Sequence, residues 1–203
     1  MKLKDQRVGV FMDVSNMYHS ARNLFSARVN FGKILERAAS DRQLIHATAY
    51  AIKTQSPDEQ PFLEALDKAG WQVKQKELQV FSDGSKKGDW DVGLAVDTIK
   101  FASKLDVIVL VTGDGDFRPL VGYLKESHGC RVEVMGFGAS SSHKIKEEAD
   151  EFIDLAEDQK TFLLPIRASL RLRPRRPRFL GGKGNEHHES RSTNQGSSDA
   201  PGS

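Results

Sequence analysis

Cysteine, long apolar runs and a secretion signal are what this sequence lacks. Cys130 is the only cysteine among 203 residues, which excludes an intrachain disulfide and a zinc site built from several thiolates. No apolar stretch approaches the roughly 20 residues of a membrane-spanning helix. The N-terminal residues MKLKDQR contain no apolar segment of the kind that directs secretion. We therefore expect a cytoplasmic protein that makes no use of a membrane.

An excess of one charge sign is also missing from most of the chain. The formal net charge is only +2. However, the residues from 165 onward carry eight Lys and Arg against three Asp and Glu, so the rest of the chain is slightly acidic. Residues 165–179 are rich in Arg and Pro, and residues 180–203 are rich in Gly, Ser, Asn and His. We predict one α/β domain over residues 1–160 and a disordered tail over residues 161–203.

A short apolar run near the middle of the chain organises the remaining pattern. Val107–Val111 (VIVLV) contains no polar residue and is followed by the turn TGDGD at 112–116. Such a run, rich in Val and Ile and ended by glycine, is typical of a central strand in a parallel sheet. The two glycines predict a sharp turn before a helix. Asp114 and Asp116 therefore stand where a buried strand passes into a helix, which is where open α/β sheets place ligand sites.

Strand-like and helix-like segments alternate along the rest of the domain. We predict further strands at 7–12, 43–53, 71–78 and 131–136, and helices at 17–25, 31–38, 57–69, 90–103, 117–128 and 140–152. This alternation predicts a parallel sheet with right-handed crossovers, and hence a three-layer α/β/α sandwich. In the helix at 90–103, the residues expected to face the sheet are Val92, Ala95, Val96, Ile99 and Ala102.

Four aspartates stand at the expected carboxyl edge of this sheet. Asp13 follows the first strand, Asp91 lies in the first turn of a helix, and Asp114 and Asp116 follow the central strand. Carboxylates within a few ångströms repel one another and must take up protons or share a cation. Oxygen ligands suit Mg²⁺ or Mn²⁺ rather than zinc, and such an ion can polarise a phosphoryl oxygen and deliver a water nucleophile. The pattern therefore favours hydrolysis of a phosphomonoester or phosphodiester.

Each acid by itself also has an ordinary structural explanation. Asp13 could cap the following helix, a carboxylate such as Asp91 is favoured near a helix N-terminus, and Asp-Gly pairs populate plain turns. Only the joint placement of these acids at strand ends favours a shared site.

Five further residues are expected around this site. Asn16 could hydrogen-bond a water on the metal or a phosphate, or simply begin a helix. Asp97 follows Asp91 on the same helix but is turned away from it by the helical repeat, so we expect it to support the site from behind. Lys86, Lys87 and Arg118 are the candidate substrate-binding cations.

Four stretches occur together in this chain, and their combination is specific. They are FMDVSN at 11–16, KKGDWDVGLAVD at 86–97, VLVTGDGDF at 109–117, and RVEVMGFGASSS with ADEFIDL within 131–155. In order and spacing they resemble the NYN domain, and more narrowly its bacterial LabA-like branch, over residues 7–156. NYN domains resemble PIN nucleases in fold and are generally understood as metal-dependent ribonucleases. The resemblance implies an acidic Mg²⁺ or Mn²⁺ centre at Asp13, Asn16, Asp91, Asp114 and Asp116, with Asp97 behind it.

We therefore predict a metal-dependent ribonuclease that holds Mg²⁺ or Mn²⁺ at its four aspartates and acts on single-stranded or structured RNA. The alternative is a non-cleaving RNA- or protein-binding regulator on the same fold. A homodimer is compatible with the sequence. The Arg-rich tail suits phosphate backbones, but a merely solubilising segment would have the same composition.

Two other classes fit less well. A haloacid-dehalogenase-type phosphatase normally has a second acid two residues after the nucleophile, and this chain has Ser15 there. A von Willebrand-type adhesion domain needs Ser where this chain has Met17.

Overall fold

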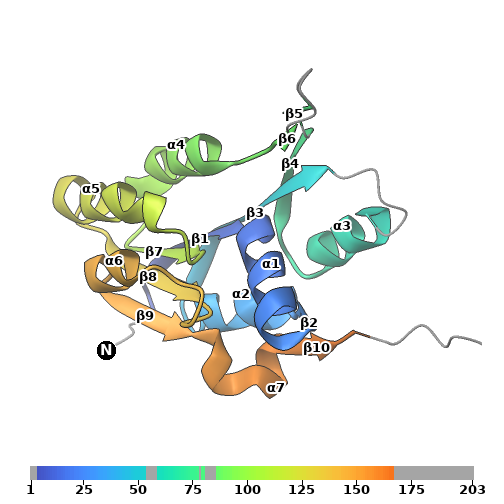
Figure 1. Cartoon of the computed structure of the whole chain (residues 1–203). Coiled ribbons are helices and arrows are strands. Elements are labelled where there is room, and N and C mark those ends of the chain that lie inside the picture. The colour runs from blue at the N-terminus through green and yellow to red at the C-terminus, as the bar shows by residue number, and fades with distance from the viewer. Residues whose placement is uncertain (1–3, 54–58, 78, 81–85, 167–203) are drawn as a thin grey trace, which may run out of the picture. The chain divides into compact units, whose positions relative to one another are not determined.

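The centre of the molecule is a parallel sheet (Figure 1). The computed structural model describes residues 4–53, 59–77, 79–80 and 86–166, and within these residues six strands form one sheet in the order β4-β3-β1-β7-β8-β9. Every neighbouring pair is parallel. The strands are β1 (Arg7–Asp13), β3 (Gln43–Lys53), β4 (Gln72–Glu77), β7 (Val107–Val111), β8 (Arg131–Gly136) and β9 (Glu151–Asp154).

The chain changes direction across the sheet at β1. From β1 it moves outward through β3 to β4, then returns to β7 on the other side of β1 and moves outward again to β8 and β9. The connections that leave the carboxyl ends of β1 and β7 therefore diverge. This is the switch point at which doubly wound sheets open a crevice for a ligand.

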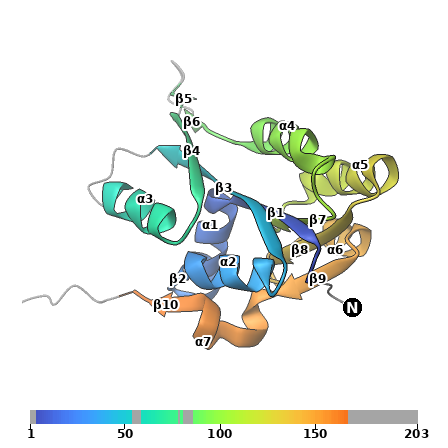
Figure 2. The same cartoon turned by 180° about the vertical axis from the view of Figure 1, so that it is seen from behind.

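Helices cover both faces of the sheet (Figures 1 and 2). One face carries α1 (Val14–Phe25), α2 (Phe31–Ala39), α3 (Glu59–Lys68) and α7 (Gln159–Phe162), and the other carries α4 (Asp91–Ala102), α5 (Arg118–His128) and α6 (His143–Glu148). Alternate residues of β7 enter the two cores: Val109 packs beneath the first set of helices, and Ile108 and Leu110 beneath the second. All of β7 is buried, as a strand covered on both faces should be. The predicted three-layer α/β/α sandwich is confirmed.

Two small antiparallel pairs complete the description. β2 (Ala27–Val29) pairs with β10 (Leu163–Pro165), and β5 (Gln79–Val80) pairs with β6 (Lys86–Lys87). The boundary placed at residue 160 lies inside α7, and the predicted tail from 167 onward lies outside the described residues. No helix in the described part of the chain is long and apolar enough to cross a bilayer.

The helix predicted at 140–152 is wrong in its second half. α6 ends at Glu148, Ala149 has extended backbone angles (φ −68°, ψ 149°), and residues 151–154 form β9 along the edge of β8. Ile153 is buried in the core beneath α1 and α2. Pairing with β8 and burial of this side chain outweigh the local preference for helix.

The prediction of which α4 residues face the sheet is only partly correct. Ala102 is buried and Ala95 packs against the core as predicted, but Val92, Val96 and Ile99 are 74%, 43% and 36% exposed. The other buried residues of α4 are Leu94, Asp97 and Thr98. Asp97 is accommodated inward because the Tyr50 hydroxyl and the Lys74 ammonium donate to its carboxylate. Since α4 has apolar residues on both sides, spacing alone does not reveal which side is buried.

Candidate active site

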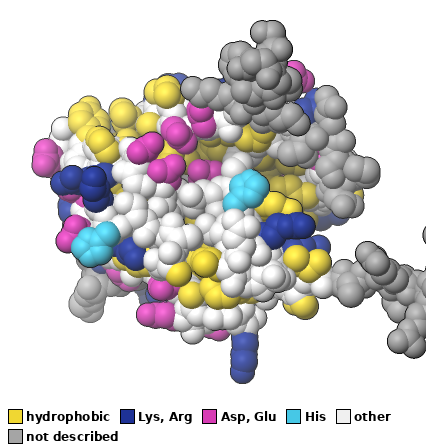
Figure 3. All heavy atoms as spheres, viewed as in Figure 1, with side chains coloured by type: hydrophobic (Ala, Val, Ile, Leu, Met, Phe, Trp, Pro, Cys, Tyr) yellow, Lys and Arg dark blue, Asp and Glu magenta, His cyan; other side chains and the backbone are white. Residues whose placement is uncertain are grey.

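Asp and Glu side chains gather on the face of the molecule shown in Figure 3. Asp13 is the last residue of β1, and Asp114 lies three residues after β7, so both stand at the carboxyl ends of neighbouring strands. Asp91 is the first residue of α4. The start of this helix is held over the end of β3, because the Trp90 indole donates to the carbonyl of Ala51 at 2.9 Å.

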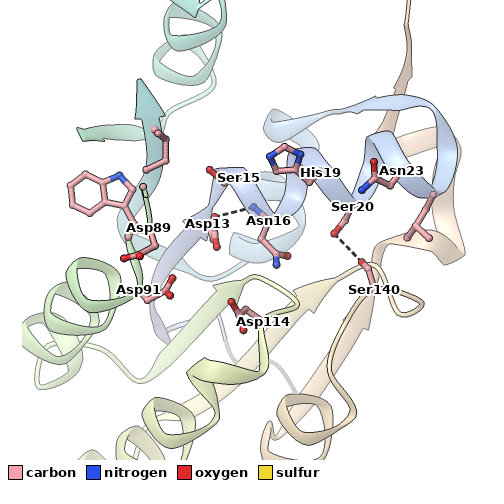
Figure 4. A pocket seen from close by; sticks show the side chains of 14 residues that line it. Asp13, Ser15, Asn16, His19, Ser20, Asn23, Asp89, Asp91, Asp114 and Ser140 are labelled. Carbon is pink, nitrogen blue, oxygen red and sulfur yellow. Dashed lines mark hydrogen bonds between the residues drawn. The ribbon is translucent and has the colours of Figure 1, made fainter. Parts of the chain in front are cut away.

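Asp13, Asp91 and Asp114 line one cavity of about 390 Å³. Figure 4 shows their side chains directed into the space between β1, α4 and the turn after β7. A cavity of this size lies within the range of pockets that hold small ligands. The structure therefore brings together three of the four predicted acids, each from a different element.

Asp13 has a structural role in addition to lining the cavity. Its Oδ1 accepts a hydrogen bond from the Asn16 N–H at 3.0 Å, so it caps α1. Burial raises the pKa of Asp13, and the neighbouring charges of Asp91 and Asp114 raise it further, against the opposing effect of the backbone hydrogen bonds.

The electrostatic surroundings of Asp91 are similar. Burial raises its pKa most, followed by the charges of Asp114, Asp89 and Asp116, while Lys76 acts in the opposite direction. Two of the acids in the cavity thus resist ionisation in the absence of a cation, and each does so partly because of Asp114.

Asn16 joins the two strand ends that form the site. Its side-chain oxygen accepts a hydrogen bond from the Gly113 N–H at 2.9 Å, while its own N–H donates to Asp13. The Asp116 N–H in turn donates to Asp114 Oδ1 at 2.9 Å. The backbone after β7 is therefore fixed relative to α1, and the Asp114 carboxylate is fixed relative to its own turn.

The structure places the remaining predicted residues away from the cavity or leaves them undescribed. Asp116 is exposed and does not line the cavity, although its charge acts on Asp91. Asp97 faces Tyr50 and Lys74 on the sheet side of α4. Arg118 pairs with Glu148, with 3.0 Å between Nε and Oε2. The side chains of Lys86 and Lys87 lie outside what the structure describes.

The donor atoms at the cavity suit a hard divalent cation. The acids supply carboxylate oxygens, which Mg²⁺ and Mn²⁺ prefer. As placed, however, no three Asp, Glu, His or Cys side chains in the described part of the chain stand close enough together to form a metal-binding group. The chemistry of the donors therefore fits, while the protein alone does not present a complete ligand shell. This is compatible with Mg²⁺, which usually keeps several waters and takes only one or two carboxylates.

One wall of the cavity consists of polar side chains that were not predicted from the sequence. Besides Asn16, α1 contributes His19, Ser20 and Asn23. These residues recur at i, i+3, i+4 and i+7 on the helix that Asp13 caps, so their spacing could have revealed them. Ser140 also lines the cavity, and its hydroxyl donates to that of Ser20 at 2.9 Å. No local pattern predicts this contact, because the residues are brought together only by the fold.

The fold and the cavity define a doubly wound α/β domain with carboxylates at its switch point. The model of the NYN domain family matches residues 7–156, and the chain belongs to that family. It is 25% identical over 174 residues to the low amplitude and bright protein LabA of Synechococcus elongatus, covering 80% of this chain and 90% of that protein. These matches confirm the resemblance to NYN domains and to LabA.

A solved structure supports the same conclusion about the fold. The crystal structure of a protein of unknown function from Vibrio parahaemolyticus has a TM-score of 0.73 and 30% sequence identity to this chain. The match covers 81% of this chain and 99% of that one.

Proposed function

We propose that this protein is a metal-dependent ribonuclease that hydrolyses RNA phosphodiester bonds at the cavity lined by Asp13, Asp91 and Asp114. The observation that carries the proposal is the convergence of three carboxylates, from three elements far apart in sequence, on one cavity at the switch point. Membership in the NYN family supports nuclease activity as the class of reaction.

Each part of the cavity has a role in this proposal. Asp13, Asp91 and Asp114 would supply carboxylate oxygens to Mg²⁺ or Mn²⁺, one or two of them directly and the rest through waters that the ion keeps, and the charge of Asp116 would act from outside the lining. When bound, such an ion supplies a positive charge that polarises a phosphoryl oxygen. Asn16 keeps Asp13 and the turn after β7 in register through its two hydrogen bonds. The polar side chains of α1 are suited to hydrogen-bond a sugar or the edge of an unpaired base.

The test is cleavage of end-labelled RNA, single-stranded and structured, by the full chain. We expect cleavage in Mn²⁺ or Mg²⁺ and none in EDTA. Asp114→Asn removes a carboxylate while keeping the size of the side chain, and should lower the rate by at least about 100-fold, because the charge on the reacting phosphate is then stabilised less well. Glu36→Gln is the matched control, since Glu36 is an exposed residue of α2 whose ion pair among the described residues is with Lys33.

The same experiment separates the proposal from its alternative. RNA binding without cleavage in any divalent ion would replace the nuclease with a non-cleaving regulator. Cleavage that survives Asp114→Asn unchanged would show that the reaction occurs elsewhere or comes from a contaminant.

A further inference from the structure

Arg22 and Tyr18 form a pair on the exposed side of α1. They stand one helical turn apart, and Arg22 Nη1 donates to the Tyr18 hydroxyl at 2.9 Å. The guanidinium carbon of Arg22 also lies 6.0 Å from the centre of the Tyr18 ring, within the range of a cation–π contact. Arg22 is exposed, and Tyr18 is 38% exposed. The guanidinium is therefore held in a fixed orientation while it remains open to solvent.

This pair adjoins the polar wall of the cavity. His19 lines the cavity, and its ring meets the Tyr18 ring edge to face, with 5.3 Å between the two centres. Arg22 follows His19 at i+3 on α1, a spacing that makes two residues neighbours on a helix surface. A ligand that leaves the cavity past His19 therefore meets the Arg22 guanidinium next.

The cations near the cavity differ in what they already bind. Arg118 pairs with Glu148, and Lys76 Nζ donates to the carbonyl of Asp89. In the part of the chain that the structure describes, no carboxylate pairs with Arg22. A guanidinium has five N–H donors, and the bond to the neighbouring phenol uses one of them. Arg22 can therefore offer donors to an oxyanion without giving up an ion pair.

The charge of the candidate site requires such a cation for an RNA ligand. Aspartates line the cavity, and among the described residues its lining contains no Lys or Arg. A metal bound by these acids would balance the charge of one phosphate, but each neighbouring phosphate of an RNA strand carries a charge of its own. The planar guanidinium of an arginine matches two oxygens of a phosphate at once.

We infer that Arg22 binds a phosphate of the RNA strand that occupies the cavity, and that Tyr18 keeps the guanidinium in position for this contact. Because Arg22 is not among the residues that line the cavity, the phosphate that it binds is a neighbour of the one attacked. RNA as the ligand rests on the proposed function, whereas the contact does not require cleavage. Arg22 therefore contributes to the affinity for RNA, and Tyr18 is a positioning residue.

The first test is the affinity of the full chain for a labelled single-stranded RNA, measured by fluorescence anisotropy over a series of salt concentrations. Binding is followed in EDTA with the unmodified chain, and in Mn²⁺ with a chain that carries Asp114→Asn, so that the RNA stays intact. Adding Arg22→Gln should weaken binding by about tenfold, the effect of losing hydrogen bonds to a charged group. It should also lower the slope of log affinity against log salt by about 0.7, the value for one phosphate of a single strand.

Lys104→Gln is the matched control for the loss of one positive charge. Lys104 is exposed and follows the C-terminal end of α4, whereas Asp91 at the other end of this helix lines the cavity. The length of α4, about 18 Å, exceeds the distance over which salt screens exposed charges, about 10 Å at 0.1 M. This variant should keep the affinity and the salt slope of the unmodified chain.

The second test separates the roles of Tyr18 and Arg22. Tyr18→Phe keeps the ring and removes the hydroxyl that accepts from Arg22. It should weaken binding by about threefold and leave the salt slope unchanged, because the guanidinium keeps its charge. Combined with Arg22→Gln, the same change should cause no further loss, because Tyr18 acts through Arg22. The melting temperature of each variant should fall by no more than about 2 °C, the effect of losing a surface pair on a helix.

Three results would overturn the inference. They are an unchanged affinity and salt slope in Arg22→Gln, a loss of affinity in Lys104→Gln as large as that in Arg22→Gln, and the absence of RNA binding under both conditions. A further loss on adding Tyr18→Phe to Arg22→Gln would overturn the positioning role of Tyr18, because Tyr18 would then contact the RNA itself. Cleavage is measured separately, so binding through Arg22 without cleavage refutes only the nuclease activity.

Discussion

Asp13 combines two roles with conflicting electrostatic requirements. As the cap of α1 it needs an oxygen that accepts the Asn16 N–H, and either a carboxylate or an amide can provide one. As a wall of the cavity it is partly buried beside Asp91 and Asp114, which raises its pKa. Without a cation, ionising the Asp13 carboxyl therefore costs more free energy in the folded chain than in the unfolded chain. A residue that lowers stability in this way is expected at a functional site, where activity rather than stability determines the side chain.

We predict that Asp13→Asn stabilises the protein in EDTA at neutral pH by about 1 kcal/mol. Because the pKa of Asp13 is higher in the folded than in the unfolded chain, wild-type stability falls as pH rises through the folded value, and the variant lacks this fall. The gain should disappear below about pH 4, where the wild-type carboxyl is protonated in both states.

Urea denaturation at several pH values measures this difference. Asp13→Ala is the control, because it removes the charge together with the cap of α1 and should gain less. An Asp13→Asn effect of the same size at all pH values would show that its cause is not the ionisation of Asp13.

At the scale of elements, the turn after β7 is positioned by contact with the loop after β8. A Cβ added at Gly113 would lie 2.7 Å from Ser141 Oγ and 3.0 Å from Ser141 Cα, and one at Gly115 would lie 2.6 Å from Ser142 Oγ. Neither glycine has a positive φ. Both glycines were predicted to form a sharp turn, and the close packing of the two loops also requires them.

We predict that Gly113→Ala lowers the free energy of unfolding by about 1–3 kcal/mol, since the added methyl must push the turn away from Ser141. The same shift would strain the bond from Gly113 to Asn16 and reduce any metal-dependent activity. Urea denaturation and the cleavage assay measure the two effects. Gly122→Ala is the control, because its Cβ would meet only Glu148, at 3.6 Å, and alanine favours the helix. Equal stability of the two variants would contradict the prediction.

At the scale of the whole molecule, the cavity depends on the order of the strands. β1 and β7 are adjacent in the sheet but are separated in the chain by every element from α1 to α4. Only this order brings the carboxylate at the end of β1 next to the turn after β7. A cation bound between these elements would link the two halves of the sheet and favour the folded chain over the unfolded one.

We predict that Mn²⁺ raises the melting temperature in a concentration-dependent way, with a stabilisation of about 2.7 kcal/mol when free Mn²⁺ is 100 times its dissociation constant. Asp91→Asn should abolish most of this rise, whereas Glu36→Gln should not. Thermal unfolding followed by circular dichroism over a Mn²⁺ series measures the effect. The same rise in the Asp91→Asn chain would place the bound ion outside the cavity.

Local sequence patterns were enough to predict those features that depend on a single physical constraint acting along the chain. A strand buried on both faces must be apolar at every position, so VIVLV predicted β7. The helix predicted to end at residue 128 does end there, and Gly129 follows it with φ +63°. Asp13, Asp91 and Asp114 could be predicted to meet, because parallel strands end at one edge of the sheet. Family membership could be predicted from the combination of motifs.

Other features depend on contacts between distant residues and could not be predicted from spacing. The pattern of α4 did not reveal which of its apolar sides is buried. That depends on Tyr50 and Lys74, which donate hydrogen bonds to Asp97 and so allow this side chain to face the sheet. Residues 151–154 become a strand because β8 offers an open edge.

The sequence by itself therefore determined the class of fold and the acids at the strand ends, since both follow from which side chains must leave water and where strands stop. Only the tertiary structure decided that Asp116 stands outside the cavity and that α1 and Ser140 line it. These placements follow from packing between elements, and no local stretch of the chain contains that information.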